Sequence, residues 1–209
     1  MNVFLASVLI GYVCGSIPSA VWIGRLIGGL DIRRQGSGNA GATNVARVLG
    51  THWGILVGVI DVAKGFLPVF FLSTTASAGI GIAPANAGLV IGAAAILGHL
   101  FPLLAGFKGG KGVLTALGMF AALLPVEAAC GVAVWGIVFT GTRIVSLGSI
   151  IASIAFAIVV VVRRYVFDVP HPPTLVVASL VIAALVGITH RANIRRLLKG
   201  EEHRFGDKR

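Results

Sequence analysis

The chain has 209 residues, of which 56% are hydrophobic and only 11% are charged, and its mean hydropathy is +0.97. So few polar side chains cannot cover the surface of a soluble domain, and an ordinary soluble protein is therefore excluded. The composition predicts an integral membrane protein instead. Its apolar runs are continuous rather than alternating, which favours an all-α protein with membrane-spanning helices over a barrel. No polar segment has the length of a soluble domain, so residues 1–209 are expected to form a single transmembrane domain.

Six apolar stretches follow one another along the chain, and the fourth is too long for one span. The first begins without a basic segment and is longer than the core of a signal peptide, so we interpret it as a retained span. The fourth, 113–141, would be about 44 Å long as one helix against a hydrocarbon core of ~30 Å. It also contains Pro125 and Glu127, and we divide it there. The seven expected spans are 3–24, 53–73, 86–105, 113–124, 126–141, 144–162 and 173–189.

The basic residues predict how these spans are oriented. Lys and Arg next to a span prefer the cytoplasm. With seven spans, the N-terminus outside and the C-terminus in the cytoplasm, 14 of the 17 Lys and Arg residues are cytoplasmic. The exceptions are Arg163 and Arg164, which fall outside, and Lys64, which lies within a span. The net charge of +10 is then mostly on one face, where it can attract anionic lipid head groups or anionic substrates.

Three polar segments are expected at that face: 33–47, 98–113 and 190–205. They are glycine-rich or basic, and they carry Asn, Ser, Thr or His. Glycines let backbone N–H groups close around an anion, helix N-termini add partial positive charge, and Lys and Arg add full charge. The three segments therefore predict sites for phosphate groups.

Two of the glycine motifs resemble nucleotide-binding fingerprints without meeting their requirements. GSGNAG at 36–41 matches G-x-G-x-x-G, but the residues before it are polar and basic rather than a buried strand. FKGGKG at 107–112 fails the ATP-binding loop pattern, because Ala105 stands at the first glycine position and Gly112 follows Lys111. Simpler explanations stay open: a tight interfacial turn for the first motif, and topological anchoring for the lysines of the second.

Other polar residues have mixed interpretations. His190 and Asn193 are spaced to share one face of a helix, and His190 is the strongest candidate for a group that titrates near neutral pH. His99 is as easily structural as functional. Asp61 and Lys64 are charges within a span, and we favour a structural ion pair because they can neutralise each other. Cys14 and Cys130 lie within spans and suggest neither a disulfide nor a metal site, and no cofactor is expected.

Five segments occur in order along the chain: SGNAGATN at 37–44, DVAKG at 61–65, GHLFPLLAGFKGGKG at 98–112, RIVSLGSI at 143–150 and HRANIRRLLKGEE at 190–202. Together they resemble the bacterial acyl-phosphate:glycerol-3-phosphate acyltransferase family, PlsY. The resemblance implies a seven-span enzyme of the bacterial inner membrane with its active site on the cytoplasmic face. Such an enzyme transfers a fatty acyl group from acyl phosphate to the 1-hydroxyl of glycerol 3-phosphate, giving lysophosphatidic acid and phosphate.

The same resemblance assigns roles to the motif residues. The acyl-phosphate pocket would be lined by Ser37, Gly38, Asn39, Gly41, Thr43 and Asn44, with Arg47 between the two substrates. Glycerol 3-phosphate would be held by Gly106, Lys108, Gly109, Gly110, Lys111 and Gly112. His190 and Asn193 would orient or polarise the reacting groups, and Ser146 or Ser149 would add a hydroxyl. The general base is either His190 or a substrate phosphate, and which loop holds which phosphate stays open.

Partners and rival functions follow from the same features. A soluble enzyme that produces acyl phosphate is a candidate partner, the bilayer surrounds the protein, and no nucleic acid is expected. The acyltransferase class with a His-x-x-x-x-Asp motif is disfavoured, because no His here has an Asp five residues on. A transporter of a phosphorylated metabolite would also use basic loops, but the chain has no internal repeat. A membrane scaffold would not need the clustered Ser, Asn, His and Lys.

Overall fold

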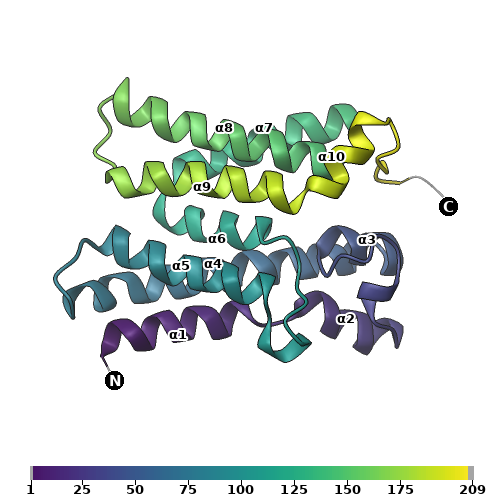
Figure 1. Cartoon of the computed structure of the whole chain (residues 1–209), viewed down its shortest axis with the longest axis horizontal. Helices are drawn as coiled ribbons and strands as arrows, with labels where there is room; N and C mark the ends of the chain where they lie inside the picture. The colour runs from purple at the N-terminus through teal and green to yellow at the C-terminus, as the bar shows by residue number, and fades with distance from the viewer. Residues whose placement is uncertain (1, 207–209) are drawn as a thin grey trace. The chain divides into compact units, whose positions relative to one another are not determined.

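The computed structural model describes residues 2–206, and every regular element in that part of the chain is a helix (Figure 1). This confirms the all-α prediction. The chain divides into two compact units, Met1–Leu123 and Leu124–Arg209. The first unit contains α1 (Val3–Gly15), α2 (Ser19–Gly28), η1 (Ile32–Arg34), α3 (Ala42–Leu49), α4 (Thr51–Ala78), α5 (Pro84–Leu100), η2 (Leu103–Ala105) and α6 (Val113–Leu123). The second contains α7 (Pro125–Thr142), α8 (Val145–Tyr165), α9 (Pro173–Thr189) and α10 (Arg191–Leu198).

The division of the long fourth stretch at Pro125 is confirmed. α6 ends at Leu123, and α7 begins with Pro125, whose missing N–H costs nothing in the first turn of a helix. Among the described residues, five helical segments are long and apolar enough to span a membrane, and the bent pair α9–α10 would be a sixth. α6 is a shorter apolar helix of 11 residues. The protein is thus a multi-pass helical membrane protein, while seven spans and their orientation stay a prediction.

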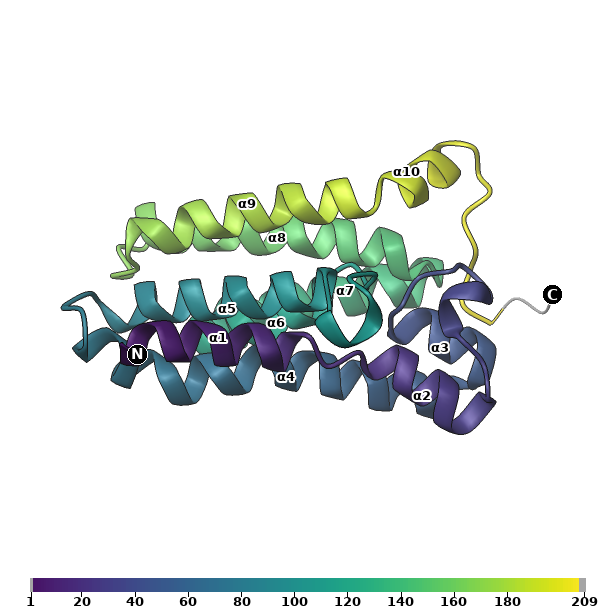
Figure 2. The ribbon, with the colours of Figure 1, turned by 60° about the horizontal axis from the view of Figure 1, so that its bottom comes forward.

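The first unit is built around α4, its longest helix. α4 packs against α1, α3, α5 and α6, and α1 also lies along α5 (Figure 2). Glycines allow these close approaches. A β-carbon on Gly15 of α1 would collide with the carbonyl of Ala95 in α5, and one on Gly118 of α6 would collide with the carbonyl of Val62 in α4. Small residues at such positions let helix backbones touch, which is how helices associate in lipid.

The first predicted span is interrupted at Pro18. α1 ends at Gly15 and α2 starts at Ser19, because proline lacks the N–H that would continue the helix. At the break, the carbonyl of Ile17 accepts from the backbone N–H of Ser19 over 3.0 Å and from Lys64 Nζ of α4 over 3.0 Å. Ser19 Oγ donates to Asp61 Oδ1 of α4 over 2.7 Å. The interruption is therefore bonded directly to the two charges of α4.

The structural ion pair predicted in α4 is confirmed. Lys64 Nζ lies 2.7 Å from Asp61 Oδ1, and the two side chains are only 4% and 2% exposed. With Ser19 on the carboxylate and the Ile17 carbonyl on the ammonium, both charges have a second polar partner. A buried ion pair is tolerated when such extra hydrogen bonds satisfy it.

The second unit has a buried acid of its own. Glu127, in the first turn of α7, is 2% exposed, and its Oε1 lies 2.6 Å from His171 Nε2 and 3.2 Å from Arg163 Nη1. His171 belongs to the connection between α8 and α9, and Arg163 to the last turn of α8. This contact gives a physical reason why Arg163 departs from the expected charge distribution: its charge is matched by a carboxylate.

Candidate active site

The segment from Ile32 to Leu49 forms an ordered loop and a short helix on a hydrophobic base. Ile32 of η1 and Val45 of α3 are fully buried, and they form one core cluster with Ala20 and Val21 of α2 and Val57 of α4. Above this base, Gly36 and Gly38 have φ of 57° and 73°, a region that favours glycine. Ser37 between them is exposed. The glycines thus turn the chain so that Ser37 faces outward.

Asn44 holds this loop in shape. It is 1% exposed, and its Oδ1 accepts from the backbone N–H of Ser37 over 2.8 Å. Its Nδ2 donates to the carbonyls of Ile32 and Gln35, over 2.9 and 3.0 Å. Both polar atoms of the side chain therefore have partners within the segment. Asn44 fixes the backbone at Ser37 and leaves the Ser37 side chain exposed. Asn39, Thr43 and Arg47 are half-buried, and Gly41 precedes the first turn of α3.

The second loop folds back onto the last turn of α5. The N–H of Gly109 donates to the carbonyl of Leu100 over 3.1 Å, and that of Gly110 to the carbonyl of His99 over 3.2 Å. A β-carbon on Gly109 would collide with the His99 carbonyl, and one on Gly110 would lie 2.6 Å from the carbonyl of Ala40. The two glycines are required by this close packing, and Lys108 projects as an exposed side chain beside them.

Gly106 and Gly112 bracket the same loop. Their φ angles are 65° and 80°, and α6 begins at Val113, directly after Gly112. Lys111 is half-buried at this entry to α6. The loop therefore presents two lysines and a tightly packed glycine backbone close to a helix N-terminus, a combination suited to anions.

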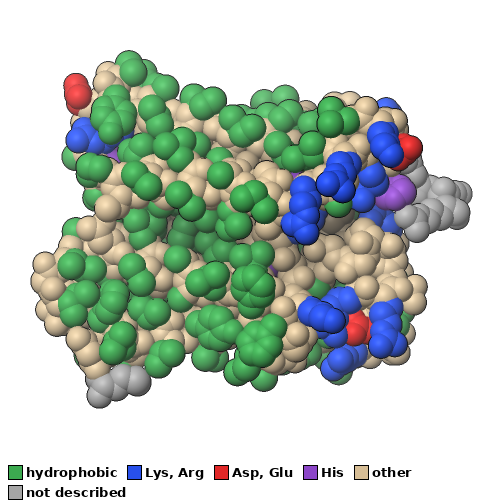
Figure 3. Space-filling view, viewed as in Figure 1, with side chains coloured by type: hydrophobic (Ala, Val, Ile, Leu, Met, Phe, Trp, Pro, Cys, Tyr) green, Lys and Arg blue, Asp and Glu red, His purple; other side chains and the backbone are tan. Residues whose placement is uncertain are grey.

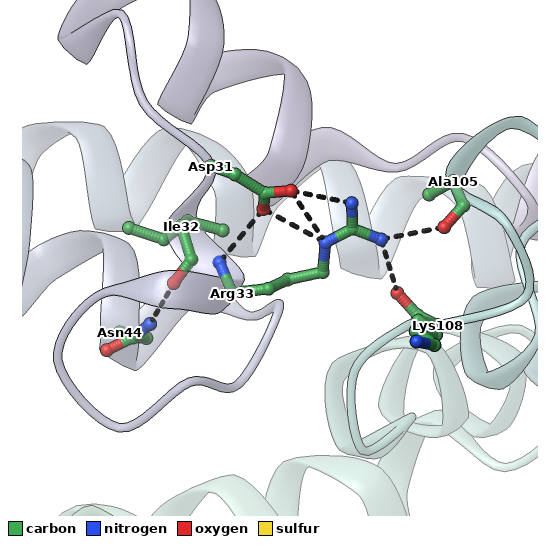
Figure 4. A network of polar contacts seen from close by, with 6 residues as sticks. All are labelled: Asp31, Ile32, Arg33, Asn44, Ala105 and Lys108. Carbon is green, nitrogen blue, oxygen red and sulfur yellow. Dashed lines mark hydrogen bonds and ion pairs between the residues drawn. The ribbon is translucent and has the colours of Figure 1, made fainter.

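Arg33 connects the two loops (Figure 4). Its Nη1 donates to the carbonyl of Ala105 over 2.7 Å and, more weakly, to that of Lys108 over 3.4 Å. Asp31 accepts from the other side of the guanidinium and from the Arg33 backbone N–H. The hydrogen bond from Arg33 lowers the pKa of Asp31 to about 2, and the same bond raises the pKa of Arg33. The pair stays ionised, and the first two predicted segments are brought together.

The charges of the first unit gather with these loops. In Figure 3, Lys and Arg side chains cluster over the end of the unit that carries α2 and α3. Hydrophobic side chains cover much of the remaining visible face of that unit. A basic end on an apolar helical body agrees with a loop region at a membrane surface.

In the second unit, Glu202 gathers three residues around its carboxylate. Ser146 Oγ and Asn193 Nδ2 donate to Oε1, over 2.8 and 2.5 Å, and Arg196 Nε donates to Oε2 over 2.6 Å. Burial alone would raise the pKa of Glu202, but the hydrogen bonds from Arg196, Asn193 and Ser146 outweigh it and hold the pKa below its usual value. The predicted residues Ser146 and Asn193 are thus brought together by an acid.

His190 is fixed at the junction of α9 and α10, where the chain bends by 63°. The side chain is 3% exposed, and Nδ1 lies 2.9 Å from the carbonyl of Val186. A carbonyl only accepts, so Nδ1 carries the proton and Nε2 is the basic nitrogen of the neutral ring. Ser149 is buried and donates to the carbonyl of Val145 over 3.0 Å.

Three contributors were not among the predicted site residues. Arg33 and Asp31 connect the loops, and Glu202 holds Ser146 and Asn193. The sequence contained signals for them: an acid two residues before an arginine in DIRR, and acids directly after the basic helix in KGEE. These short patterns show where the charges are. They do not show that Arg33 bonds to Ala105 or that Glu202 bonds to Ser146.

The fold and these polar centres define a class: a multi-pass helical membrane protein with basic, glycine-rich loops. The family model described as glycerol-3-phosphate acyltransferase matches residues 5–200. The chain belongs to this family, as the motifs predicted, and it is an acyltransferase. The family assignment rests on nearly the whole chain.

Relatives and solved structures agree with the family model. A glycerol-3-phosphate acyltransferase from Chlorobaculum tepidum is 41% identical over 100% of both chains. One from Anaeromyxobacter dehalogenans is 45% identical over 95% of this chain and 96% of its own. A crystal structure of PlsY (YgiH), an integral membrane glycerol 3-phosphate acyltransferase in its glycerol 3-phosphate form, superposes with a TM-score of 0.84. It is 42% identical and covers 97% of this chain and 96% of that chain.

Proposed function

We propose that this enzyme transfers a fatty acyl group from acyl phosphate to the 1-hydroxyl of glycerol 3-phosphate, giving lysophosphatidic acid and phosphate. The observation that carries the proposal is the pair of basic glycine loops joined by Arg33 in the first unit. Both substrates carry phosphate, and two adjoining anion-binding loops suit two phosphates. The related crystal structures are of a glycerol 3-phosphate form and a lysophosphatidic acid form, which agrees with acceptor and product.

The first loop is proposed to hold acyl phosphate, and the second to hold glycerol 3-phosphate. Ser37, which Asn44 orients through its backbone N–H, would bind the donor together with Gly38, Asn39, Gly41 and Thr43. Arg47 would lie between the substrates. Lys108 and Lys111 would supply charge to the acceptor phosphate, with the backbone of Gly106, Gly109, Gly110 and Gly112 shaped around it.

The second unit is proposed to contribute the proton chemistry, so that residues 1–209 act as a single membrane domain. With Nδ1 bonded to Val186, the Nε2 of His190 is the nitrogen able to accept the proton of the glycerol hydroxyl. A substrate phosphate oxygen is the alternative base. Asn193, held by Glu202, would orient a reacting group, with Ser146 or Ser149 adding a hydroxyl. A soluble enzyme that produces acyl phosphate would supply the donor.

The test of this function is a reaction of the purified protein in detergent. A long-chain acyl phosphate and glycerol 3-phosphate are added, and lysophosphatidic acid and phosphate are measured by mass spectrometry and phosphate assay. Equal amounts of both products are expected. A parallel reaction with an acyl thioester as donor is the control. Product from the thioester alone would contradict the proposed donor, and no product from either donor would contradict the function.

Removing either proposed phosphate-binding charge should reduce catalysis. A charge-assisted hydrogen bond is worth about 1.5–3 kcal/mol, so Lys111→Ala and Arg47→Ala are each expected to lower kcat/KM about ten- to a hundredfold. Steady-state kinetics with each substrate varied in turn show which KM rises. Arg34→Ala is the matched control, since Arg34 is an exposed arginine of η1 outside the proposed site. Unchanged kinetics of both variants in well-folded protein would remove these residues from the site.

The transfer is expected to be direct, without an acyl-enzyme intermediate. Acyl phosphate is already activated, so aligning the hydroxyl, neutralising charge and removing one proton are sufficient tasks. Mixing the enzyme with acyl phosphate alone should release no phosphate in the first turnover. A burst equal to the enzyme concentration, with a hydroxylamine-sensitive acyl group on Ser37, would replace this mechanism by a two-step one.

The three polar segments are proposed to lie on the cytoplasmic side of the bacterial inner membrane. In a background with Cys14 and Cys130 replaced by alanine, Arg34→Cys and Lys199→Cys should react with an impermeant thiol reagent only from the cytoplasmic side. Ala83→Cys, at an exposed position between α4 and α5, should react only from outside. All three positions are exposed, so the labelling reports sidedness. Labelling of Arg34→Cys or Lys199→Cys from outside would contradict the proposed orientation.

A further inference from the structure

A buried polar cluster lies beneath the second loop of the first unit. It consists of Ser19 of α2, Asp61 and Lys64 of α4, and His99 in the last turn of α5. His99 is 7% exposed, and its Nδ1 lies 3.7 Å from Asp61 Oδ1, beyond hydrogen-bond distance. Within the described part of the chain this nitrogen has no hydrogen-bond partner. The ring is therefore held by its surroundings rather than by a bond of its own.

The Nε2 and Cε1 atoms of the His99 ring lie against the glycine loop. A β-carbon on Gly110 would collide with Nε2 of His99, so the ring edge lies directly against the Gly110 backbone. The His99 carbonyl also accepts the Gly110 N–H. The same hypothetical β-carbon would lie 2.6 Å from the carbonyl of Ala40, which belongs to the first loop. The His99 ring and the Ala40 carbonyl of the first loop thus both lie close to Gly110.

The Asp61–Lys64 pair next to the His99 ring is held in place by hydrogen bonds. Asp61 is held by Ser19 and Lys64, and Lys64 is held in turn by the carbonyl of Ile17. The carboxylate cannot move toward the loop without breaking these bonds. A small pocket lined by Ser19, Lys64, His99, Lys108, Gly109 and Gly110 shows that the cluster reaches up to the loop.

Stability alone is a poor explanation for these charges. A buried ion pair contributes little compared with hydrophobic residues of the same volume, because desolvation opposes the attraction. Such a pair does provide a fixed position. The imidazole of His99 lies between this pair and Gly110.

We propose that His99 is a positioning residue: wedged between the fixed Asp61–Lys64 pair and Gly110, its ring sets the height of the Gly109–Gly110 backbone for the phosphate of glycerol 3-phosphate. The inference rests on the proposed function, in which this loop binds the acceptor. In this role His99 contacts the loop and would not touch the reacting atoms. Its loss should therefore weaken acceptor binding and leave the donor and the chemical step nearly unaffected.

The test compares His99→Ala with His99→Gln and with Ile91→Ala. A misplacement of about 1 Å can cost up to a hundredfold, so His99→Ala is expected to raise the KM for glycerol 3-phosphate about tenfold. The kcat and the KM for acyl phosphate should change by less than about threefold. His99→Gln keeps much of the volume and should recover part of the loss. Ile91→Ala is the matched control, because it opens a fully buried site two turns earlier in α5.

A second measurement is independent of turnover. Hydrogen exchange of the backbone amides of residues 105–112 should be faster in His99→Ala than in the unmodified protein and in Ile91→Ala. Calorimetric titration should show weaker glycerol 3-phosphate binding by His99→Ala, and unchanged binding by Ile91→Ala. An equal rise of both KM values, the same effects in Ile91→Ala, or unchanged exchange and binding in folded His99→Ala would overturn the inference. If the unmodified protein neither binds nor acylates glycerol 3-phosphate, the proposed function fails instead, while the exchange experiment still decides whether His99 positions the loop.

Discussion

Replacing Asp61 by leucine is expected to destabilise the protein by about 3–5 kcal/mol, because it leaves the buried ammonium of Lys64 without its counter-ion. Lys64 is 4% exposed and would retain only the carbonyl of Ile17. Ser19 would lose its acceptor as well. For a chain of this length the melting temperature in detergent should fall by roughly 10 °C.

The double variant Asp61→Leu/Lys64→Met tests the origin of this loss. It removes both charges together, and hydrophobic residues of similar volume often replace a buried pair at little cost. Most of the lost melting temperature should return. A double variant that is no more stable than Asp61→Leu would show that the destabilisation comes from packing around α4 and not from the unpaired charge.

Replacing Glu202 by alanine should weaken the proposed contribution of Asn193 to catalysis. Ser146, Asn193 and Arg196 would all lose their shared acceptor. Each buried donor left unpaired costs about 1–3 kcal/mol, and Asn193 loses the carboxylate that holds it, so kcat should fall about ten- to a hundredfold. The effect should appear in kcat more than in the KM for glycerol 3-phosphate, since the proposed phosphate-binding residues lie in the first unit.

Two variants control this result. Glu201→Ala removes the neighbouring, exposed acid and should retain activity. Glu202→Gln keeps one oxygen for Ser146 and Asn193 but offers an amide nitrogen that cannot accept from Arg196, so its loss should be intermediate. If Glu202→Ala turns over like the unmodified protein, Asn193 does not depend on this carboxylate.

Most of the fold was predictable because lipid restricts the choices. Long apolar runs must be helical, and the excessive length of 113–141, together with Pro125, predicted the boundary that the structure confirms. The interruption of the first span at Pro18 was not predicted. Its consequence depends on Ser19 and Ile17 meeting α4, and such contacts between distant parts of the chain leave no periodic signal.

The sequence predicted which residue types the candidate site contains, but not which residues they bond to. Phosphate chemistry requires glycine, Lys, Arg and polar side chains, and these stand out in an apolar sequence. What each side chain bonds to depends on the tertiary structure. Asn44 was expected to face a substrate, and the structure shows its amide bonded to Ile32, Gln35 and Ser37. Substrate contact by Asn44 stays a prediction.

The backbone contacts at Gly15 and Gly118 limit how the first unit can move. Where two helices touch through a glycine and a carbonyl, as α1 does with α5 and α6 with α4, neither can roll about its axis without bringing a larger side chain into the contact. Gly11, one turn before Gly15, makes the same kind of close approach to the carbonyl of Ile91 in α5, so the contact extends along the two helices. The helical part of this unit is thus a rigid frame. Admission of a long acyl chain and release of a lipid product must be accommodated by the loops, whose hydrogen bonds can open while the frame stays unchanged.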